Sequence, residues 1–161
     1  MEQTFDRAEV ERLVNTYSDL ILRVSYTYLN NTHDAQDICQ TVFLKLLTGN
    51  RQFRSPEHEK AWMIRTTINA CKDLLGSAWH SRTCGIEACA EVAAPEVEDG
   101  SLLAAVNMLP EKYRLVIYLH YYEGYSAREI AAMLGENAAT VGTRLFRGRK
   151  QLKSILGGET V

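Results

Sequence analysis

The feature that most constrains the fold of this chain is a pair of helix signals in its last third, separated by a short turn. Ser126 followed three positions later by Glu129 forms a capping box, which satisfies backbone N–H groups at the start of a helix. Gly135 suits the left-handed position that ends such a helix, and Asn137 is suited to cap the next one. The order of these signals predicts a helix-turn-helix, whose second helix can enter a DNA major groove.

The charge of the second predicted helix points to the same kind of partner. Residues 137–154 contain no carboxylate and five cations, which are Arg144, Arg147, Arg149, Lys150 and Lys153. The whole chain has a formal net charge of −2, so these cations are a local concentration. A cationic helix binds a polyanion by neutralising phosphates and releasing counterions. A solvated surface helix can carry similar charge, but it needs no capped partner helix before it, so the pattern favours nucleic-acid binding.

The composition is typical of an ordinary globular protein. With 46% hydrophobic and 24% charged residues, a chain of 161 residues can form one domain or two small ones. No window reaches the apolar length of a membrane span, and residues 1–6 are acidic and polar, so we expect a cytoplasmic protein without membrane insertion. No phosphate-binding glycine loop and no set of nucleophile, base and orienting residue is visible, so the sequence does not indicate an enzyme.

The spacing of cysteine and histidine predicts neither a disulfide framework nor a metal site. The four cysteines are Cys39, Cys71, Cys84 and Cys89, and in a cytosolic protein we expect them to be reduced. His80, Cys84 and Cys89 supply three loosely spaced ligands, whereas a structural zinc takes four. We therefore expect no metal and no cofactor.

Helical periodicity predicts an all-α chain of two small domains. Helices expected at about 6–29, 34–47 and 56–75 form the first domain, residues 1–82. Between Thr83 and Glu111 there are six carboxylates and no cation, which predicts a flexible acidic linker over residues 83–99. The second domain, residues 100–161, is expected to hold four helices, the last two of which form the helix-turn-helix.

Three blocks of this chain together resemble the sigma-70 family of bacterial RNA polymerase, in particular its small two-domain extracytoplasmic-function (ECF) sigma factors. The blocks are Asp34–Leu46, Ala61–Leu75 and the segments 109–114, 122–131 and 140–150. The resemblance implies that the first block binds core polymerase and that the second recognises and melts the −10 promoter element. It implies that the third block recognises the −35 element.

The residues that the resemblance assigns to polymerase binding are Asp34, Asp37, Gln40, Thr41 and Phe43. Helical spacing places the last four clear of the apolar stripe formed by Ile38, Val42 and Leu46. An alternative is that Asp34 and Asp37 only favour a helix N-terminus through the helix dipole. Thr41 stands where the family often has a glutamate.

The residues assigned to the −10 element are Arg51, Arg54, Trp62, Arg65, Asn69 and Lys72. The last three share a polar helix face, where an asparagine can read a base edge and cations can contact the backbone. The family flips a base into a pocket near the loop before this helix, and Phe53 or Trp62 is a candidate to line it. The alternative for Trp62 is a core anchor.

The residues assigned to the −35 element are Arg128, Thr140, Gly142, Thr143, Arg144, Phe146, Arg147, Arg149 and Lys150. Among them Arg147 is the best candidate for reading a guanine, and Phe146 for contacting a thymine methyl group. We expect Arg128 to meet a phosphate, and Arg144 and Arg149 to bind phosphates or form intramolecular salt bridges.

The sequence therefore predicts a sigma factor that directs core RNA polymerase to specific promoters and enables transcription initiation. Its expected partners are the core enzyme, promoter DNA and an anti-sigma protein. One alternative is a decoy that mimics a sigma factor and sequesters an anti-sigma protein, but such a decoy has no need of the cations at 144–153. Another is a stand-alone helix-turn-helix regulator, which leaves the blocks at 34–46 and 62–75 unexplained.

Overall fold

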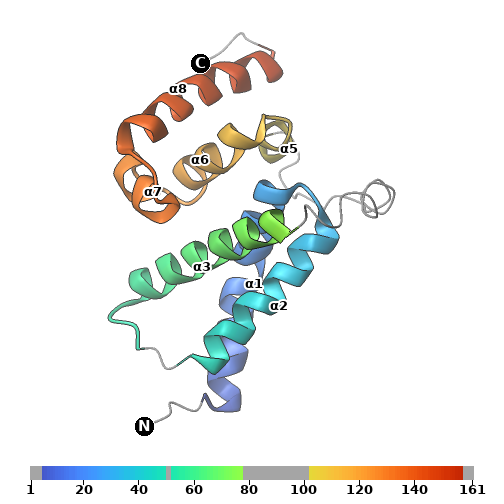
Figure 1. The fold of residues 1–161 in the computed structure, drawn as a ribbon, viewed down its shortest axis with the longest axis vertical. Helices are drawn as coiled ribbons and strands as arrows, with labels where there is room; N and C mark the ends of the chain where they lie inside the picture. Colours follow the sequence, from blue (N-terminus) through green and yellow to red (C-terminus); the bar gives the residue numbers. More distant parts are fainter. Residues whose placement is uncertain (1–4, 50–51, 78–101, 158–161) are drawn as a thin grey trace. The chain divides into compact units, whose positions relative to one another are not determined.

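A computed structural model describes residues 5–49, 52–77 and 102–157 (Figure 1). The chain divides into two compact units, Met1–Ala94 and Pro95–Val161. In the described ranges it forms seven α-helices and no strand, which confirms the all-α fold class. We call the three helices of the first unit module 1 and the four helices of the second unit module 2. The predicted acidic linker at 83–99 lies outside the described residues.

Module 1 consists of α1 (Arg7–Leu29), α2 (Thr32–Thr48) and α3 (Pro56–Ser77). The Asp6 side chain caps α1 by accepting a hydrogen bond from the Glu9 N–H at 2.8 Å. Asn30 ends α1 in the left-handed conformation, with a φ of 55°. Asn31 then caps α2, so this helix begins at Thr32, slightly before the predicted start at residue 34.

The core of module 1 is formed by one apolar stripe from each helix. Helix α1 packs against both α2 and α3, which also pack against each other. The predicted stripe of α2 is confirmed, because Ile38, Val42 and Leu46 are all buried. The buried residues of α1 and α3 that join them are Leu13, Tyr17, Ile21, Met63, Ala70 and Cys71.

Module 2 consists of α5 (Leu102–Asn107), α6 (Glu111–Tyr121), α7 (Ala127–Leu134) and α8 (Ala138–Ile155). The predicted capping box of α7 is present, with both Ser126–Glu129 hydrogen bonds formed. Gly135 ends α7 with a φ of 67°, and the Asn137 side chain caps α8 through the Ala139 N–H at 2.8 Å. The structure therefore has the helix-turn-helix that the sequence predicts.

The position of α8 is set by its close contact with α6. Val141 and Leu145 are buried on the inner side of α8, and Gly148 is buried beside them. A Cβ atom at position 148 would lie 2.9 Å from Ile117 Cγ1 and 3.2 Å from Tyr113 Cβ, so the two helices touch where α8 has no side chain. This contact leaves the opposite side of α8 exposed.

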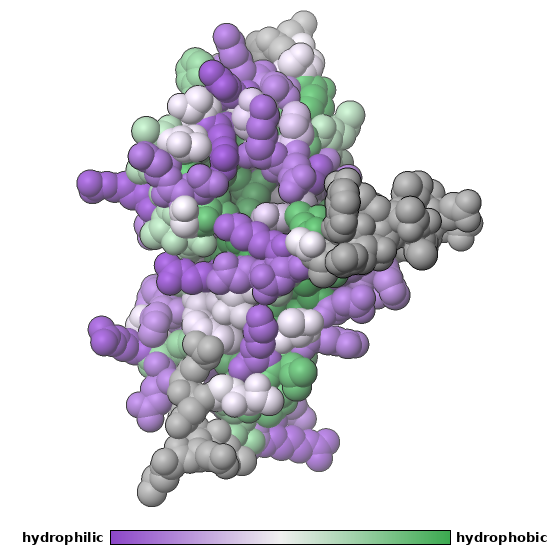
Figure 2. All heavy atoms as spheres, viewed as in Figure 1, coloured by the Kyte–Doolittle hydropathy of each residue, from purple (hydrophilic) through white to green (hydrophobic). Residues whose placement is uncertain are grey.

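The surface of the molecule is mainly polar in the view of Figure 2, where hydrophilic side chains project and hydrophobic residues lie mostly between them. Within the described ranges, no helix has the length and apolar character that crossing a bilayer requires.

Candidate nucleic-acid and partner interfaces

The exposed side of α8 brings together four of the residues predicted to contact DNA. Thr140, Thr143, Arg147 and Lys150 follow one another at intervals of three or four positions, which places them on one helix face. The last three are exposed, Thr140 is half-buried, and the core residues lie on the opposite side. We call these four residues the reading face of α8.

Phe146 lies beside the reading face and is 65% exposed. The Lys150 ammonium group lies 6.0 Å from the centre of the Phe146 ring, at the outer limit of a cation–π contact. Gly142 lies on the same flank, and nothing stands within 4 Å of the Cβ that an alanine would have there. A large exposed aromatic ring beside cations is suited to apolar contact with a base methyl group.

Arg144 and Arg149 are arranged differently from the reading face. Arg144 forms a salt bridge of 3.6 Å with Glu136 in the turn between α7 and α8. Of the two roles expected for Arg144, a phosphate contact or an intramolecular salt bridge, the structure has the salt bridge. Arg149 is two positions beyond Arg147 and is therefore rotated roughly 200° away from it around the helix. Arg128 is exposed in the first turn of α7.

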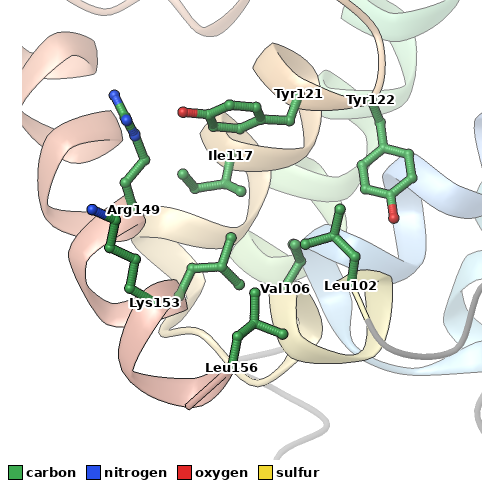
Figure 3. A pocket seen from close by; sticks show the side chains of 9 residues that line it. Leu102, Val106, Ile117, Tyr121, Tyr122, Arg149, Lys153 and Leu156 are labelled. Carbon is green, nitrogen blue, oxygen red and sulfur yellow. The ribbon is translucent and has the colours of Figure 1, made fainter. Parts of the chain in front are cut away.

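Arg149 instead lines an apolar pocket of about 270 Å³ between α5, α6 and α8. Figure 3 shows Arg149 and Lys153 on the α8 side of this pocket, with Ile117 and Tyr121 of α6 beside them. The other lining residues are Leu102, Val106, Tyr122, Leu152 and Leu156. The structure thus separates Arg149 from the residues with which the sequence grouped it.

In module 1, α3 carries four of the six residues predicted for the −10 element, and Arg54 lies in the loop before it. Arg65, Asn69 and Lys72 are exposed at intervals of three or four positions, and half-buried Trp62 continues the same face toward the helix start. Trp62 also packs against the module 1 core, so it contributes to core packing, as the alternative interpretation predicts. The predicted residue Arg51 lies outside the described residues.

His58 begins this face and was missed from the sequence. Its ring lies 5.6 Å from that of Phe53, which lies 5.7 Å from that of Trp62, so three aromatic side chains meet at the start of α3. His58 Nδ1 accepts a hydrogen bond from the Arg54 N–H at 3.2 Å. The signal was its spacing, four positions before Trp62 and seven before Arg65.

The exposed side of α2 holds three of the residues predicted to bind polymerase, namely Asp37, Gln40 and Thr41. Asp34 is half-buried in the first turn. Phe43 is half-buried because it packs against the module 1 core, so it presents less surface than the sequence suggested.

Leu44 is a further candidate on α2 that the sequence analysis missed. It is 64% exposed and lies seven positions after Asp37 and three after Thr41, which places it on the same face. We call Asp37, Gln40, Thr41 and Leu44 the outer face of α2. A single exposed apolar side chain is common on protein surfaces, so Leu44 is a candidate because of its position beside Asp37 and Thr41.

The two described cysteines are not arranged for metal or redox chemistry. Burial raises the pKa of the Cys71 thiol to about 12 and also raises that of Cys39, so both are weak nucleophiles. In the part of the chain that the structure describes, no three His, Cys, Asp or Glu side chains gather in a way that suits a metal ion. His80, Cys84 and Cys89 lie outside it.

Module 2 contains a capped helix-turn-helix with a cationic outer side. Module 1 adds a basic and aromatic face on α3. These features together define a two-module DNA-binding protein. Residues 13–81 match the family model of Sigma-70 region 2, and residues 99–152 match that of Sigma-70, region 4. The chain belongs to the sigma-70 family, and its relatives include ECF sigma factors.

Two relatives and one solved structure illustrate the similarity. The chain is 31% identical over 140 residues to the RNA polymerase sigma factor SigV of Bacillus subtilis, covering 85% of this chain and 84% of SigV. It is 31% identical over 157 residues to the ECF RNA polymerase sigma factor SigE of Mycolicibacterium smegmatis, covering 91% of this chain and 61% of SigE. Its fold is similar to that of the sigma factor RpoE in complex with the anti-sigma factor NepR from Bartonella quintana, with a TM-score of 0.66, 18% identity, and coverage of 93% of this chain and 98% of that one.

Membership of this family makes the chain a promoter-directing factor of transcription initiation that associates with RNA polymerase. The family consists of initiation factors that are not themselves catalytic. Because region 2 and region 4 are both matched, neither the decoy nor the stand-alone regulator is favoured.

Proposed function

We propose that the promoter-directing work is divided between the two modules. Module 1, within residues 1–82, binds core polymerase through the outer face of α2 and the −10 element through α3. Module 2, within residues 100–161, binds the −35 element through α8, and residues 83–99 connect them. The observation that carries this proposal is that α2, α3 and α8 each bury one side in a core and expose a second side with different side-chain chemistry.

The −35 assignment is supported by the reading face of α8. A guanidinium can form two hydrogen bonds with the O6 and N7 atoms of guanine, which makes Arg147 the residue proposed to read a base. Lys150 and the α7 residue Arg128 are proposed to contact phosphates, which position the helix without reading sequence. Arg149 lies away from this face, so we propose at most a peripheral phosphate contact for it.

The −10 assignment is supported by the composition of the exposed α3 side. Arg65 and Lys72 are suited to the phosphate backbone, and Asn69 between them is suited to a base edge. The rings of Phe53, His58 and Trp62 at the start of the helix offer surfaces on which an unpaired base can stack.

The polymerase assignment is supported by the outer face of α2. Asp37, Gln40 and Thr41 offer polar contacts, and Leu44 adds an apolar side chain that burial in an interface would remove from water. Phe43 remains in the proposal mainly as a support for the helix, because its ring packs against the core.

The proposal also covers an anti-sigma partner, the chemistry of transcription and the place of action. The sigma factor RpoE with a similar fold was solved in complex with an anti-sigma factor, which supports an anti-sigma partner here as well. The chain itself catalyses no reaction, and the polymerase does the chemistry. The place of action is the cytoplasm, where the polymerase meets promoter DNA.

The experiment that tests this function is a reconstitution of the full chain with bacterial core RNA polymerase on a genomic template. We expect transcripts from a restricted set of start sites that share upstream elements, and none of these starts with core polymerase alone. Starts identical to those of the core alone would refute the sigma-factor role. Binding of an anti-sigma protein without any new starts would favour the decoy instead.

A further inference from the structure

An ionic cluster of one buried carboxylate, Glu59, and a half-exposed arginine, Arg12, joins the first turn of α3 to α1. The Glu59 carboxylate accepts hydrogen bonds from both terminal nitrogens of Arg12, at 3.2 Å and 3.0 Å, and from the Tyr17 hydroxyl at 2.6 Å. Arg12 also donates to Glu9 through Nη2 at 2.7 Å and Nε at 3.2 Å. Glu59 is only 9% exposed, although it is a carboxylate.

The members of this cluster hold each other in the charged form. Burial alone would raise the pKa of Glu59, but the hydrogen bonds from Arg12 and Tyr17 outweigh it and hold that pKa below its ordinary value. Hydrogen bonds to Glu9 and Glu59 raise the pKa of Arg12. At neutral pH the contact is therefore a true ion pair with two parallel hydrogen bonds.

An ion pair of this kind is a poor way to gain stability but a good way to set an orientation. Holding the Glu59 carboxylate out of water costs much of what its attraction to the half-exposed Arg12 returns, and apolar replacements of such pairs are often as stable. The planar fork of an arginine bound to a carboxylate is directional, however, whereas packed methyl groups tolerate sliding.

The cluster lies at the start of α3, where half-buried Phe53 and Trp62 also pack against the core of module 1. Of residues 56–62, all of which the structure describes, only Glu59 is buried, and the next buried residue is Met63. The Glu59 N–H donates to the Ser55 carbonyl at 3.0 Å, and the His58 N–H donates to Ser55 Oγ at 3.1 Å. The loop before α3 is therefore joined to the same turn, and moving Glu59 would move His58 and the loop with it.

We propose that Arg12, Tyr17 and Glu59 are positioning residues for promoter opening. They set the first turn of α3 and the adjoining residues 52–55 in the geometry that accepts the −10 strand, and none of the three touches DNA. This inference rests on the proposed function of α3 in −10 recognition.

The test replaces the ion pair by apolar side chains of similar length in the variant Arg12→Met/Glu59→Leu. The full chain is combined with bacterial core polymerase, and open complexes are measured by permanganate reactivity of −10 thymines at saturating holoenzyme. We expect a folded protein that binds core polymerase as the wild type does but opens promoters about tenfold less, because small displacements of a supporting shell cost this much or more.

Three single variants sharpen the test. Arg12→Lys keeps the charge but loses the two-pronged contact, and Tyr17→Phe removes one hydrogen bond, so both should show smaller losses of opening in the same direction. Arg7→Met is the matched control, because Arg7 forms an exposed pair with Glu11 on the same helix, and it should leave opening unchanged.

Normal opening by the double variant would overturn the inference, as would a loss of opening that merely follows a loss of core binding. If the double variant does not fold, Arg12→Lys and Tyr17→Phe decide, and normal opening by both overturns it. The variant Arg65→Ala/Asn69→Ala distinguishes a failure of the proposed −10 function of α3 from a failure of the positioning role of Arg12, Tyr17 and Glu59. If it opens promoters normally, the proposed function of α3 fails; if it is defective while the cluster variants are normal, only the positioning inference fails.

Discussion

Replacing Gly148 by alanine should destabilise module 2, although alanine is the better helix former. The added Cβ would stand 2.9 Å and 3.1 Å from two side-chain carbons of Ile117 and 3.2 Å from Tyr113 Cβ. The Ile117 side chain is buried but lines the apolar pocket and has space beside it, whereas Tyr113 Cβ can move only with the backbone of α6 and cannot give way cheaply. Overpacking costs about 1–3 kcal/mol, and removing a glycine from a helix interior gains about 1 kcal/mol. The expected net loss in the free energy of unfolding is about 1 kcal/mol.

Gly142→Ala is the matched control, because it lies on the same helix with nothing within 4 Å of its added Cβ. This variant should gain the helix propensity alone, about 1 kcal/mol, so the two alanines should differ by about 2 kcal/mol. Hydrogen exchange of the α6 and α8 amides in the full chain measures the opening of module 2 by itself, which avoids assuming one transition for both modules. Equal stabilisation by the two substitutions would refute the idea that α6 and α8 need a glycine where they cross.

Two further predictions concern the proposed interfaces, and a third concerns the Glu59 carboxylate. Arg147→Ala should cost about 1–3 kcal/mol of binding free energy on the preferred −35 sequence and relax the preference at one base pair. Lys150→Ala should instead weaken binding to all sequences and reduce the slope of log affinity against log salt concentration by about one. Equal losses on preferred and scrambled DNA for both variants would contradict the assignment of base reading to Arg147. Leu44→Ala should weaken core-polymerase binding by about 1 kcal/mol or more in a titration, and Leu75→Ala, an exposed control on α3, should not. Because the pKa of Glu59 is lower in the folded protein than in the unfolded chain, its contribution to stability is complete above about pH 5 and is lost as the pH falls below about 4. Acid unfolding followed by circular dichroism should therefore be less steep for Glu59→Gln.

Local chemistry explains why the helix boundaries could be predicted. A capping side chain interacts with backbone groups two or three residues away, so Ser126 with Glu129 and Asp6 with Glu9 contain their own structural information. Gly135 is a similar case, because only its own backbone conformation is at issue.

The features that the sequence did not reveal depend on a partner from elsewhere in the chain. Phe43 and Leu44 are consecutive on α2 and point about 100° apart, so spacing places Leu44 opposite the buried stripe, but it takes the neighbouring helices to show that Phe43 packs against the core. Glu59 looks like an ordinary charge of a first helical turn until Arg12 and Tyr17 of α1 are placed beside it. The separation of Arg149 from Arg147 is an exception, because it follows from the rotation of about 100° per helical residue and could have been predicted from the sequence.

The division of α8 into a packed side and a reading face has a consequence for how such proteins diversify. Val141, Leu145 and Gly148 are buried where α8 packs against the rest of module 2, while Thr143 and Arg147 are exposed on its other side. Substitutions at exposed helix positions usually change stability by less than about 0.5 kcal/mol. If these positions read the −35 element as proposed, mutation can explore new promoter preferences there without first passing through an unstable intermediate, and the same freedom is available for retargeting the protein by design.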